Sequence, residues 1–231
     1  MSTAIAIVSG GLDSTTLAYL LHAEGYDLHL LSFDYGQRHR KELVFAERSA
    51  RRLEAEFDII DLSHIGQFLK GSALTDDIPV PDGHYSAPTM AITVVPNRNA
   101  IMLSIAYGIA VAEGAEIVAI GVHAGDHFIY PDCRPAFITA FDTMERAAVE
   151  GTGNPELRLE APFQHLSKGQ IVRLGAALGV PFADTWSCYK GGEKHCGRCG
   201  TCVERKEAFR EAGVVDPTEY EDREYAPENP F

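Results

Sequence analysis

The chain has 231 residues, 45% of them hydrophobic and 23% charged, which fits one sizeable folded domain and excludes a collagen-like or extensively disordered protein. Its formal net charge of −13 disfavours tRNA or DNA as a partner, because such polyanions are bound through Lys and Arg side chains that neutralise phosphates. The apolar N-terminal run lacks a basic region, and the longest apolar stretch, residues 100–112, is too short to span a bilayer. We therefore expect a cytoplasmic protein.

Short apolar runs alternate with longer helical patterns along the chain. The expected strands are residues 4–8, 27–33, 57–61, 116–122 and 156–161. The expected helices are residues 15–24, 41–55, 99–113, 135–149, 171–178 and 203–212, and residues 71–88 are expected to form a long surface loop. Ser167 and Gln170 have capping-box spacing ahead of one helix. This alternation predicts an α/β fold with a parallel sheet, whose ligands lie at the carboxyl ends of the strands.

A glycine-rich turn, Ser9-Gly10-Gly11-Leu12-Asp13-Ser14-Thr15-Thr16, separates the first strand from the first helix. Two adjacent glycines are expected to take positive φ and to turn their N–H groups inward as an anion nest. The hydroxyls of Ser9, Ser14 and Thr15 add donors, and the helix N-terminus adds positive potential. Asp13 would repel a phosphate unless Mg²⁺ lay between them, so the turn favours a metal-bridged nucleotide. The alternative is a tight turn that Asp13 or Ser14 merely caps.

The pattern S-G-G-x-D-S in this turn resembles the signature of the PP-loop family of ATP pyrophosphatases, and neither a Walker A loop nor a dinucleotide fingerprint is present. The resemblance implies a Rossmann-like fold of the adenine-nucleotide alpha-hydrolase type. It also implies cleavage of ATP between the α- and β-phosphates, with adenylation of a carbonyl or carboxyl oxygen.

Four of the five cysteines lie close together near the C-terminus. The spacing Cys188-x7-Cys196-x2-Cys199-x2-Cys202 predicts a closed, structural zinc site, for which an iron–sulfur cluster is the main alternative. His195 is expected to be an exposed bystander, and Cys133 a small buried residue. We therefore expect an ATP-binding catalytic domain at 1–184, a zinc-binding segment at 185–215 and a loose acidic tail at 216–231.

Beyond the loop, nearly the whole chain resembles the family of 7-cyano-7-deazaguanine synthases within the PP-loop enzymes. The resemblance rests on Asp34-Tyr35-Gly36-Gln37-Arg38-His39, Val95-Pro96-Asn97-Arg98-Asn99, Asp126 with Tyr130-Pro131-Asp132-Cys133-Arg134, Ser167-Lys168-Gly169-Gln170 and the four cysteines. His127-Phe128 departs from the family pattern. The resemblance implies that 7-carboxy-7-deazaguanine, ammonia and ATP give 7-cyano-7-deazaguanine through an adenylated carboxylate and then an activated amide, in queuosine or another deazapurine pathway. It further implies Mg²⁺, Zn²⁺ and a homodimer.

The resemblance also implies roles for single residues. Nucleotide phosphates would be held by Ser9, Gly10, Gly11, Leu12, Asp13, Ser14, Thr15, Thr16 and Asp34. Catalytic roles fall to Asp13, Arg98 and Lys168, the last neutralising charge that develops on the phosphates. Contacts to the substrate fall to Gln37, Asn99, Asp126, Tyr130, Asp132 and Arg134, since carboxylates accept from a guanine edge and Arg suits a carboxyl group.

Other interpretations stay open at this stage. Lys168 can be an ordinary exposed lysine, Asn99 a helix cap, and the Asp132–Arg134 segment a surface salt-bridge loop. Asp34 can simply begin a turn. The rival functions are a tRNA-modifying PP-loop enzyme, an amidating ligase of the asparagine- or NAD-synthetase type, and a non-catalytic module that binds AMP.

Overall fold

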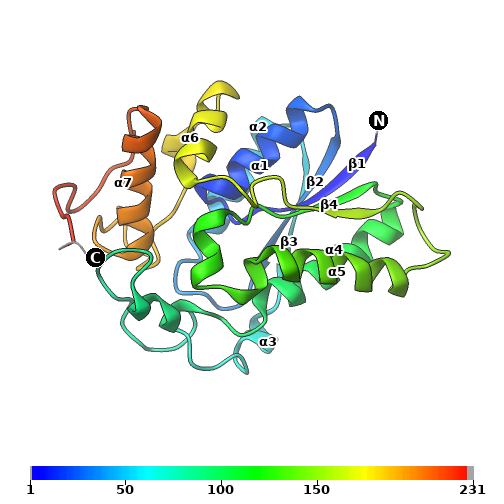
Figure 1. The fold of residues 1–231 in the computed structure, drawn as a ribbon, viewed down its shortest axis with the longest axis horizontal. Coiled ribbons are helices and arrows are strands. Elements are labelled where there is room, and N and C mark those ends of the chain that lie inside the picture. The colour runs from blue at the N-terminus through cyan, green and yellow to red at the C-terminus, as the bar shows by residue number, and fades with distance from the viewer. Residues whose placement is uncertain (1, 228–231) are drawn as a thin grey trace.

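The computed structural model of the chain describes residues 2–227. Its centre is a five-stranded sheet in the order β3-β2-β1-β4-β5 (Figure 1). The strands are β1 (Thr3–Ile7), β2 (Asp27–Asp34), β3 (Glu56–Asp61), β4 (Ile117–Ala119) and β5 (Arg158–Glu160). All four neighbouring pairs run parallel. The predicted α/β fold with a parallel sheet is confirmed.

Helices cover both faces of this sheet, so the molecule has three layers (Figure 1). On one side lie α1 (Leu12–Ala23), α2 (Glu42–Arg52) and α6 (Lys168–Ala177), with α7 (Gly200–Ala212) packed on α6. On the other side lie α4 (Arg98–Glu113) and α5 (Pro135–Ala148). Among the helices of residues 2–227, none combines the length and apolar character that a membrane crossing requires.

The first strand explains why two layers of helices form. Successive side chains of a strand point to opposite faces, and every residue from Ala4 to Val8 is buried. Ala4 and Ala6 belong to the core shared with α1, α2 and α6, whereas Ile5 and Ile7 belong to the core shared with α4 and α5. A strand that is apolar on both faces therefore has to be covered on both, as parallel sheets usually are.

The predicted helices are present, but several begin earlier than expected. The first begins at Leu12 rather than at residue 15, which places Asp13 and Ser14 in its first turn. The predicted capping box is confirmed, because Ser167 accepts from the Gln170 N–H and Gln170 accepts from Ser167, so α6 begins at Lys168. The fourth strand was predicted too long, because the strand spans only Ile117–Ala119.

Two segments outside the regular elements differ from the expectation of exposed, irregular chain. The loop at 71–88 is not purely a surface loop, because Leu74, Val80 and Tyr85 in it are buried. Short helices that were not predicted lie nearby: α3 (Ser63–Gly66) and the 3₁₀ turns Pro88–Thr93, Ala124–Phe128, Pro131–Cys133 and Phe182–Asp184. In the C-terminal tail, Tyr220 pairs with His195 through a β-bridge. The end of the tail, residues 228–231, lies outside the described residues.

Candidate active site

The topology brings three chain segments together at one edge of the sheet. Strand β1 is flanked by β2 and β4, so its carboxyl end is the point where the strand order reverses. A cavity of about 1090 Å³, part of it open to solvent, lies at this edge. The segments that follow β1, β2 and β4 supply residues of its wall, and α4, α6 and the cysteine segment supply others. This is where an open α/β sheet is expected to bind a ligand.

The glycine-rich turn forms one end of the cavity, and its two glycines differ from each other. Gly10 has a φ of +81°, as expected, and a Cβ there would come within 2.3 Å of the Glu42 carbonyl oxygen in α2. Gly11 has an ordinary φ of −74° and is the N-cap of α1, so the expectation of two left-handed glycines is wrong. The hydroxyls of Ser9 and Ser14 lie 3.2 Å apart, and the Ser9 N–H donates to Ser14 Oγ.

A charged network lies just inside this turn. Lys168 Nζ is 2.9 Å from Asp13 Oδ2 and 2.9 Å from Glu204 Oε2. Burial by itself would raise the pKa of Asp13, but the charges of Lys168 and His123 outweigh it and hold that pKa below its ordinary value. Burial lowers the pKa of Lys168, yet Asp13 and Glu204 raise it well above the ordinary value. Lys168 is therefore a firmly charged ammonium at the glycine-rich turn, and the interpretation of it as an ordinary exposed lysine is wrong.

His123, which follows β4, connects this network to the rest of the cavity. Its Nδ1 accepts from the Gly125 N–H, and its Nε2 lies 3.3 Å from Lys168 Nζ. That Nε2 lies 3.5 Å from Asp126 Oδ1 and 3.9 Å from Asp13 Oδ2. Asp126 Oδ1 also accepts from the Tyr85 hydroxyl at 3.0 Å. The ring thus links the carboxylate at the phosphate turn to the carboxylate deeper in the cavity.

The other end of the cavity is aromatic and contains one guanidinium. Arg98 donates from Nη1 to the Tyr35 hydroxyl, and Tyr130 and Tyr189 contribute to the same wall. Within residues 2–227, no carboxylate oxygen lies within 4.0 Å of the Arg98 guanidinium. Burial raises the pKa of Tyr35 and of Tyr189, so these phenols stay protonated. A planar ligand can stack on these aromatic rings, and a carboxylate group can pair with the Arg98 guanidinium.

The structure brings most of the predicted site residues to the cavity. Those that line it are Ser9, Gly11, Leu12, Asp13, Ser14, Arg98, Asn99, Asp126, Tyr130 and Lys168. Gly10, Thr15 and Thr16 do not line the cavity; Thr16 Oγ1 donates to the Leu12 carbonyl. The remaining predicted residues are engaged elsewhere: Asp34 pairs with Arg40, Gln37 bonds to the Tyr35 N–H, and Asp132 accepts from the Asn99 N–H. Arg134 is exposed and donates to the His127 carbonyl.

Several residues in this wall were not singled out from the sequence. They are His39, Glu42, Tyr85, His123, Trp186, Tyr189 and Glu204, all of which line the cavity or join its hydrogen bonds. Tyr85 comes from the loop at 71–88, and the last three come from the cysteine segment and α7. His39 and Glu42 lie directly after the Asp-Tyr-Gly-Gln run, so proximity to that run was the available indication. The others are distant in sequence, and only the fold brings them here.

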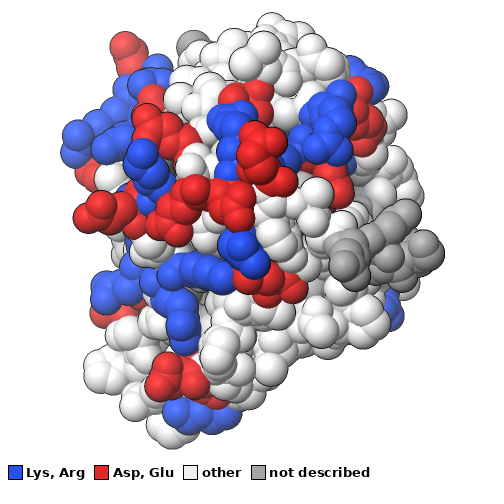
Figure 2. Space-filling model, turned by 90° about the vertical axis from the view of Figure 1, so that its left-hand side faces the viewer, with Lys and Arg blue, Asp and Glu red and all other residues white. Residues whose placement is uncertain are grey.

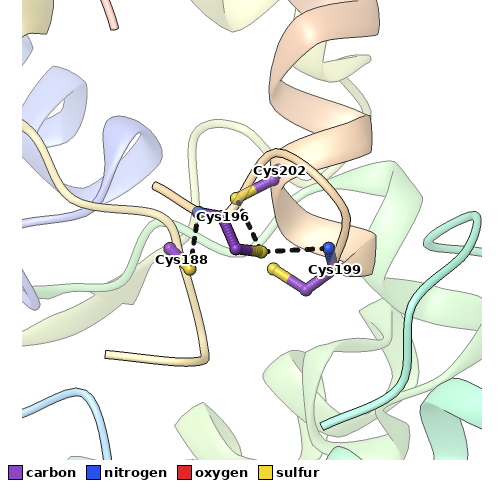
Figure 3. Close-up of side chains that lie close together, drawn as sticks. All are labelled: Cys188, Cys196, Cys199 and Cys202. Atoms are coloured by element: carbon purple, nitrogen blue, oxygen red, sulfur yellow. Dashed lines mark hydrogen bonds between the residues drawn. The ribbon is translucent and has the colours of Figure 1, made fainter. Parts of the chain in front are cut away.

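The four clustered cysteines form a second site (Figure 3). Their side chains come from three neighbouring segments and point toward one another. All four are free and buried, and their sulfur atoms lie within 4.8 Å of one another. Cys196 Sγ and Cys202 Sγ are 3.9 Å apart, close to the ~3.8 Å that a tetrahedral zinc with Zn–S bonds of about 2.3 Å requires. The N–H groups of Arg198 and Cys199 donate to Cys196 Sγ, which favours a thiolate. The cluster fits a zinc site.

Two other predictions concerned residues next to these sites. His195 was expected to be exposed, but it is buried, packs against the Trp186 ring with ring centroids 4.3 Å apart, and accepts at Nε2 from the Ser187 N–H. Its role in the segment is therefore structural. Cys133 is buried as predicted, and Asn99 Nδ2 donates to its sulfur. Burial raises the pKa of the Cys133 thiol, which makes it a poor candidate for sulfur transfer.

The face that carries α7 and the end of the described chain shows mixed charge. Figure 2 shows Lys and Arg interspersed with Asp and Glu over this face. Arg198, for example, pairs with both Asp82 and Asp222. Part of the basic charge on this side of the molecule is therefore balanced by carboxylates.

The sheet order, the glycine-rich turn after β1 and the cavity beside it define a Rossmann-like α/β protein of the PP-loop type. The structure of NMN synthetase from Francisella tularensis has a similar fold, with a TM-score of 0.53 over 93% of this chain and 78% of that chain at 18% identity. The model of the family described as "Queuosine biosynthesis protein QueC" matches residues 3–213, and the chain belongs to this enzyme family. Relatives named 7-cyano-7-deazaguanine synthase from Ruegeria sp. strain TM1040 and Brucella anthropi are each 62% identical over 96% of this chain and 94% of their own length. The family resemblance seen in the sequence is thereby confirmed.

Proposed function

We propose that this protein uses ATP to convert 7-carboxy-7-deazaguanine and ammonia to 7-cyano-7-deazaguanine, the product named in its relatives. The observation that supports this most directly is the cavity itself, which joins a glycine-rich turn suited to phosphates to an aromatic pocket where the Arg98 guanidinium has no carboxylate partner among residues 2–227. Such a cavity would hold the α-phosphate of a nucleotide next to the carboxylate of a flat heterocycle. The binding sites for the nucleotide and for the acid would then both be formed by this chain.

The first subsite takes the nucleotide. The turn at residues 9–14 would receive the phosphates, with Gly11 and Leu12 N–H groups at the start of α1. Lys168 would leave its pairing with Asp13 and neutralise the charge that grows on the phosphates. Asp13 Oδ1 is buried without a hydrogen-bond partner among the described residues, so it is available for a cation. Mg²⁺ bound there would offset the repulsion between this carboxylate and the phosphates.

The second subsite takes the acid. Tyr35, Tyr130 and Tyr189 would stack on or border the deazaguanine ring, and Arg98 would orient its carboxylate. Asp126, already held by Tyr85 and His123, would accept from the N–H donors of the guanine edge. A carboxylate oxygen is a poor leaving group until it is adenylated. Ammonia then displaces AMP to give the amide, and a second activation of the amide oxygen gives the nitrile.

The cysteine cluster would serve this site indirectly. Zinc held by Cys188, Cys196, Cys199 and Cys202 has no free position for a substrate, so it would act by fixing the fold of its segment. That segment supplies Trp186, Ser187, Tyr189 and Thr201 to the cavity wall. Zinc binding and a complete active site are therefore linked.

The test is to incubate the pure protein with Mg-ATP, ammonium and 7-carboxy-7-deazaguanine and to follow the products by mass spectrometry. We expect the amide to appear first and the nitrile second, with two AMP and two pyrophosphate formed for each nitrile. Turnover of ATP with a different carboxylic acid but not with this one would leave the PP-loop chemistry in place and refute the substrate. Formation of ADP and phosphate would refute adenylation.

A further inference from the structure

A histidine and a glutamate of the cavity wall have no part in the roles assigned so far. His39 and Glu42 lie before and at the start of α2, and both line the cavity on the side of Arg98. Both are nearly inaccessible to solvent, with exposed fractions of 3% and 9%. His39 Nε2 lies 3.4 Å from Glu42 Oε1. Burying an imidazole and a carboxyl group costs folding free energy, because both groups lose hydration. A functional role for the pair would account for this cost.

The hydrogen bonds around this pair determine where the histidine proton lies. Gln37 Nε2 donates to Glu42 Oε1 at 3.4 Å, so Oε1 is an acceptor. The nitrogen of His39 that faces Oε1 is therefore best placed as the N–H, and the neutral ring keeps its lone pair on Nδ1. Among residues 2–227, Nδ1 has no hydrogen-bond partner although it is buried. His39 thus lines the cavity with a buried proton acceptor that no described residue uses.

The groups that face this pair come from several elements. They are Arg98 of α4, Tyr35 after β2, Tyr189 of the cysteine segment, which packs on the His39 ring at 5.2 Å, and Tyr130 between β4 and α5. Burial and the Arg98 charge lower the pKa of His39 to about 3, so its lone pair is free at working pH. Burial raises the pKa of Glu42 to about 8, against the opposing effect of Arg98. Ionised Glu42 would stabilise an imidazolium beside it.

We propose that His39, oriented by Glu42, is the base that takes protons from the nitrogen during the ammonia steps. This inference rests on the proposed function. When ammonia attacks the acyl adenylate, the C–N bond forms, the bond from carbon to the AMP oxygen breaks, and the nitrogen gives up one proton. That proton passes to His39 Nδ1, and the imidazolium is paired with the Glu42 carboxylate. In the second round, after His39 has released its proton to solvent, the amide nitrogen loses both of its protons: one as adenylation of the amide oxygen gives the O-adenyl imidate, and one as the bond from carbon to the AMP oxygen breaks and the nitrile forms. His39 takes each of these protons in turn and passes the first to solvent before it takes the second.

This assignment separates the nitrogen chemistry from the adenylation chemistry. Adenylation of the carboxylate moves no proton, so it depends on Lys168 and Arg98 and not on a base. His39 touches the reacting nitrogen and is the catalytic residue, whereas Glu42 acts through His39 and is a positioning residue. Loss of either should slow the capture of ammonia and leave the first half-reaction intact.

The test compares two half-reactions in three variants. His39→Phe keeps a ring against Tyr189 but has no acceptor, and Glu42→Gln keeps the acceptor oxygen but has no charge. Glu145→Gln is the matched control, because Glu145 is a buried glutamate in α5, bonded to Ser104 and outside the cavity. Exchange of labelled pyrophosphate into ATP, driven by 7-carboxy-7-deazaguanine without ammonia, reports adenylation. Amide formation reports the ammonia step, with rates referred to free ammonia.

We expect exchange to stay within threefold of the wild type in all variants. The kcat/KM for ammonia should fall about 100- to 1000-fold in His39→Phe, as is typical for loss of a general base, and by about 10- to 100-fold in Glu42→Gln. The wild-type rate should rise with a midpoint near pH 8, and Glu42→Gln should lack this rise. Hydroxylamine, whose nitrogen is a weaker base and needs less help to lose its proton, should still trap the adenylate in both variants.

Two results would overturn the proposal. A parallel loss of exchange and of amide formation would mean that the pair holds the acid or the nucleotide, and an ammonia rate within threefold of wild type in His39→Phe would mean that no base is needed there. Absence of exchange in the wild-type protein is a different result: it would refute the proposed substrate, and the inference would fall with it. Melting temperatures of the variants separate misfolding from either outcome, and hydroxylamine trapping confirms that each variant retains an intact adenylation site.

Discussion

Lys168 and Asp13 lie 155 positions apart in the sequence, since 168 − 13 = 155, and their charged groups are 2.9 Å apart in the structure. Asp13 is in the first turn of α1, which follows β1, and Lys168 is the first residue of α6. Both helices therefore begin at the same edge of the sheet, and their N-termini both point toward the space where phosphates are expected. In the structure the two side chains pair with each other. When ATP binds, we expect Lys168 to pair with the phosphates and Asp13 to bind Mg²⁺.

The Lys168→Met variant tests the role of this ammonium. Without it, no cation of the network offsets the charge that develops on the phosphates, so we expect kcat for pyrophosphate release to fall by about 100- to 1000-fold. Steady-state pyrophosphate release measures this. The exposed Lys70 gives the control, and Lys70→Met should keep the wild-type rate. A Lys168→Met enzyme within fivefold of wild type would show that the lysine only balances Asp13 and Glu204.

We expect Arg98 to contribute to binding of 7-carboxy-7-deazaguanine rather than to binding of ATP. Its guanidinium has a fork of donors that fits a carboxylate, which a single ammonium does not reproduce. Arg98→Lys should therefore raise the KM for 7-carboxy-7-deazaguanine by about 10- to 100-fold, a loss of about 1.5–3 kcal/mol. The dissociation constant for ATP, measured by calorimetry, should change less than threefold. An equal weakening of both ligands would place Arg98 at the phosphates instead.

Glu42 also gives a prediction about stability. Its pKa in the folded protein is about 8, above the ordinary value of 4.5, so the folded state holds its proton more tightly than the unfolded state. Stability from this group is then fully present below pH 4.5 and is lost as the pH rises toward 8. Glu42→Gln cannot ionise, so relative to wild type it should become more stable between pH 5 and pH 8. Urea unfolding at both pH values measures this, and an equal difference in stability from wild type at pH 5 and at pH 8 would contradict it.

The cysteine segment connects metal content to activity. Because its residues Trp186, Ser187 and Tyr189 line the cavity, removal of zinc should unfold this wall and abolish turnover. Cys202→Ser should lose the metal, lower the melting temperature and lose activity together. Metal analysis of the wild type should give one zinc for each chain. A brown protein containing iron and sulfide would identify an iron–sulfur cluster instead.

Local sequence patterns predicted the parallel sheet, the main helices and the cysteine cluster. Buried strands, the capping box at Ser167 and the cysteine spacing depend on neighbours within a few positions, so they could be read directly. The cavity wall opposite Arg98 could not, because Tyr85, His123 and Glu204 reach it from three separate elements. Burial of His195 was missed for a similar reason: it depends on packing against Trp186 and Tyr220, nine or more positions away.

The same limit applies to Gly10, whose need for glycine has two causes of which the sequence indicated one. The turn predicted a positive φ, but the structure adds a contact: a Cβ at Gly10 would lie 2.3 Å from the Glu42 carbonyl and 2.6 Å from the Ala46 nitrogen. These are backbone atoms of α2 and cannot rotate away. The first glycine of the turn therefore sets how closely α2 approaches the phosphate turn.

Gly25 provides a matched control for this contact. It has a φ of +88°, similar to that of Gly10, but a Cβ there would meet nothing within 4 Å. Gly25→Ala should cost only the backbone strain, about 1–2 kcal/mol. Gly10→Ala should cost about 3 kcal/mol or more, because α2 has to shift as well. The shift would also displace Glu42, so amide formation should fall further than the exchange of pyrophosphate. Equal urea midpoints for the two variants would show that backbone conformation alone requires glycine at position 10.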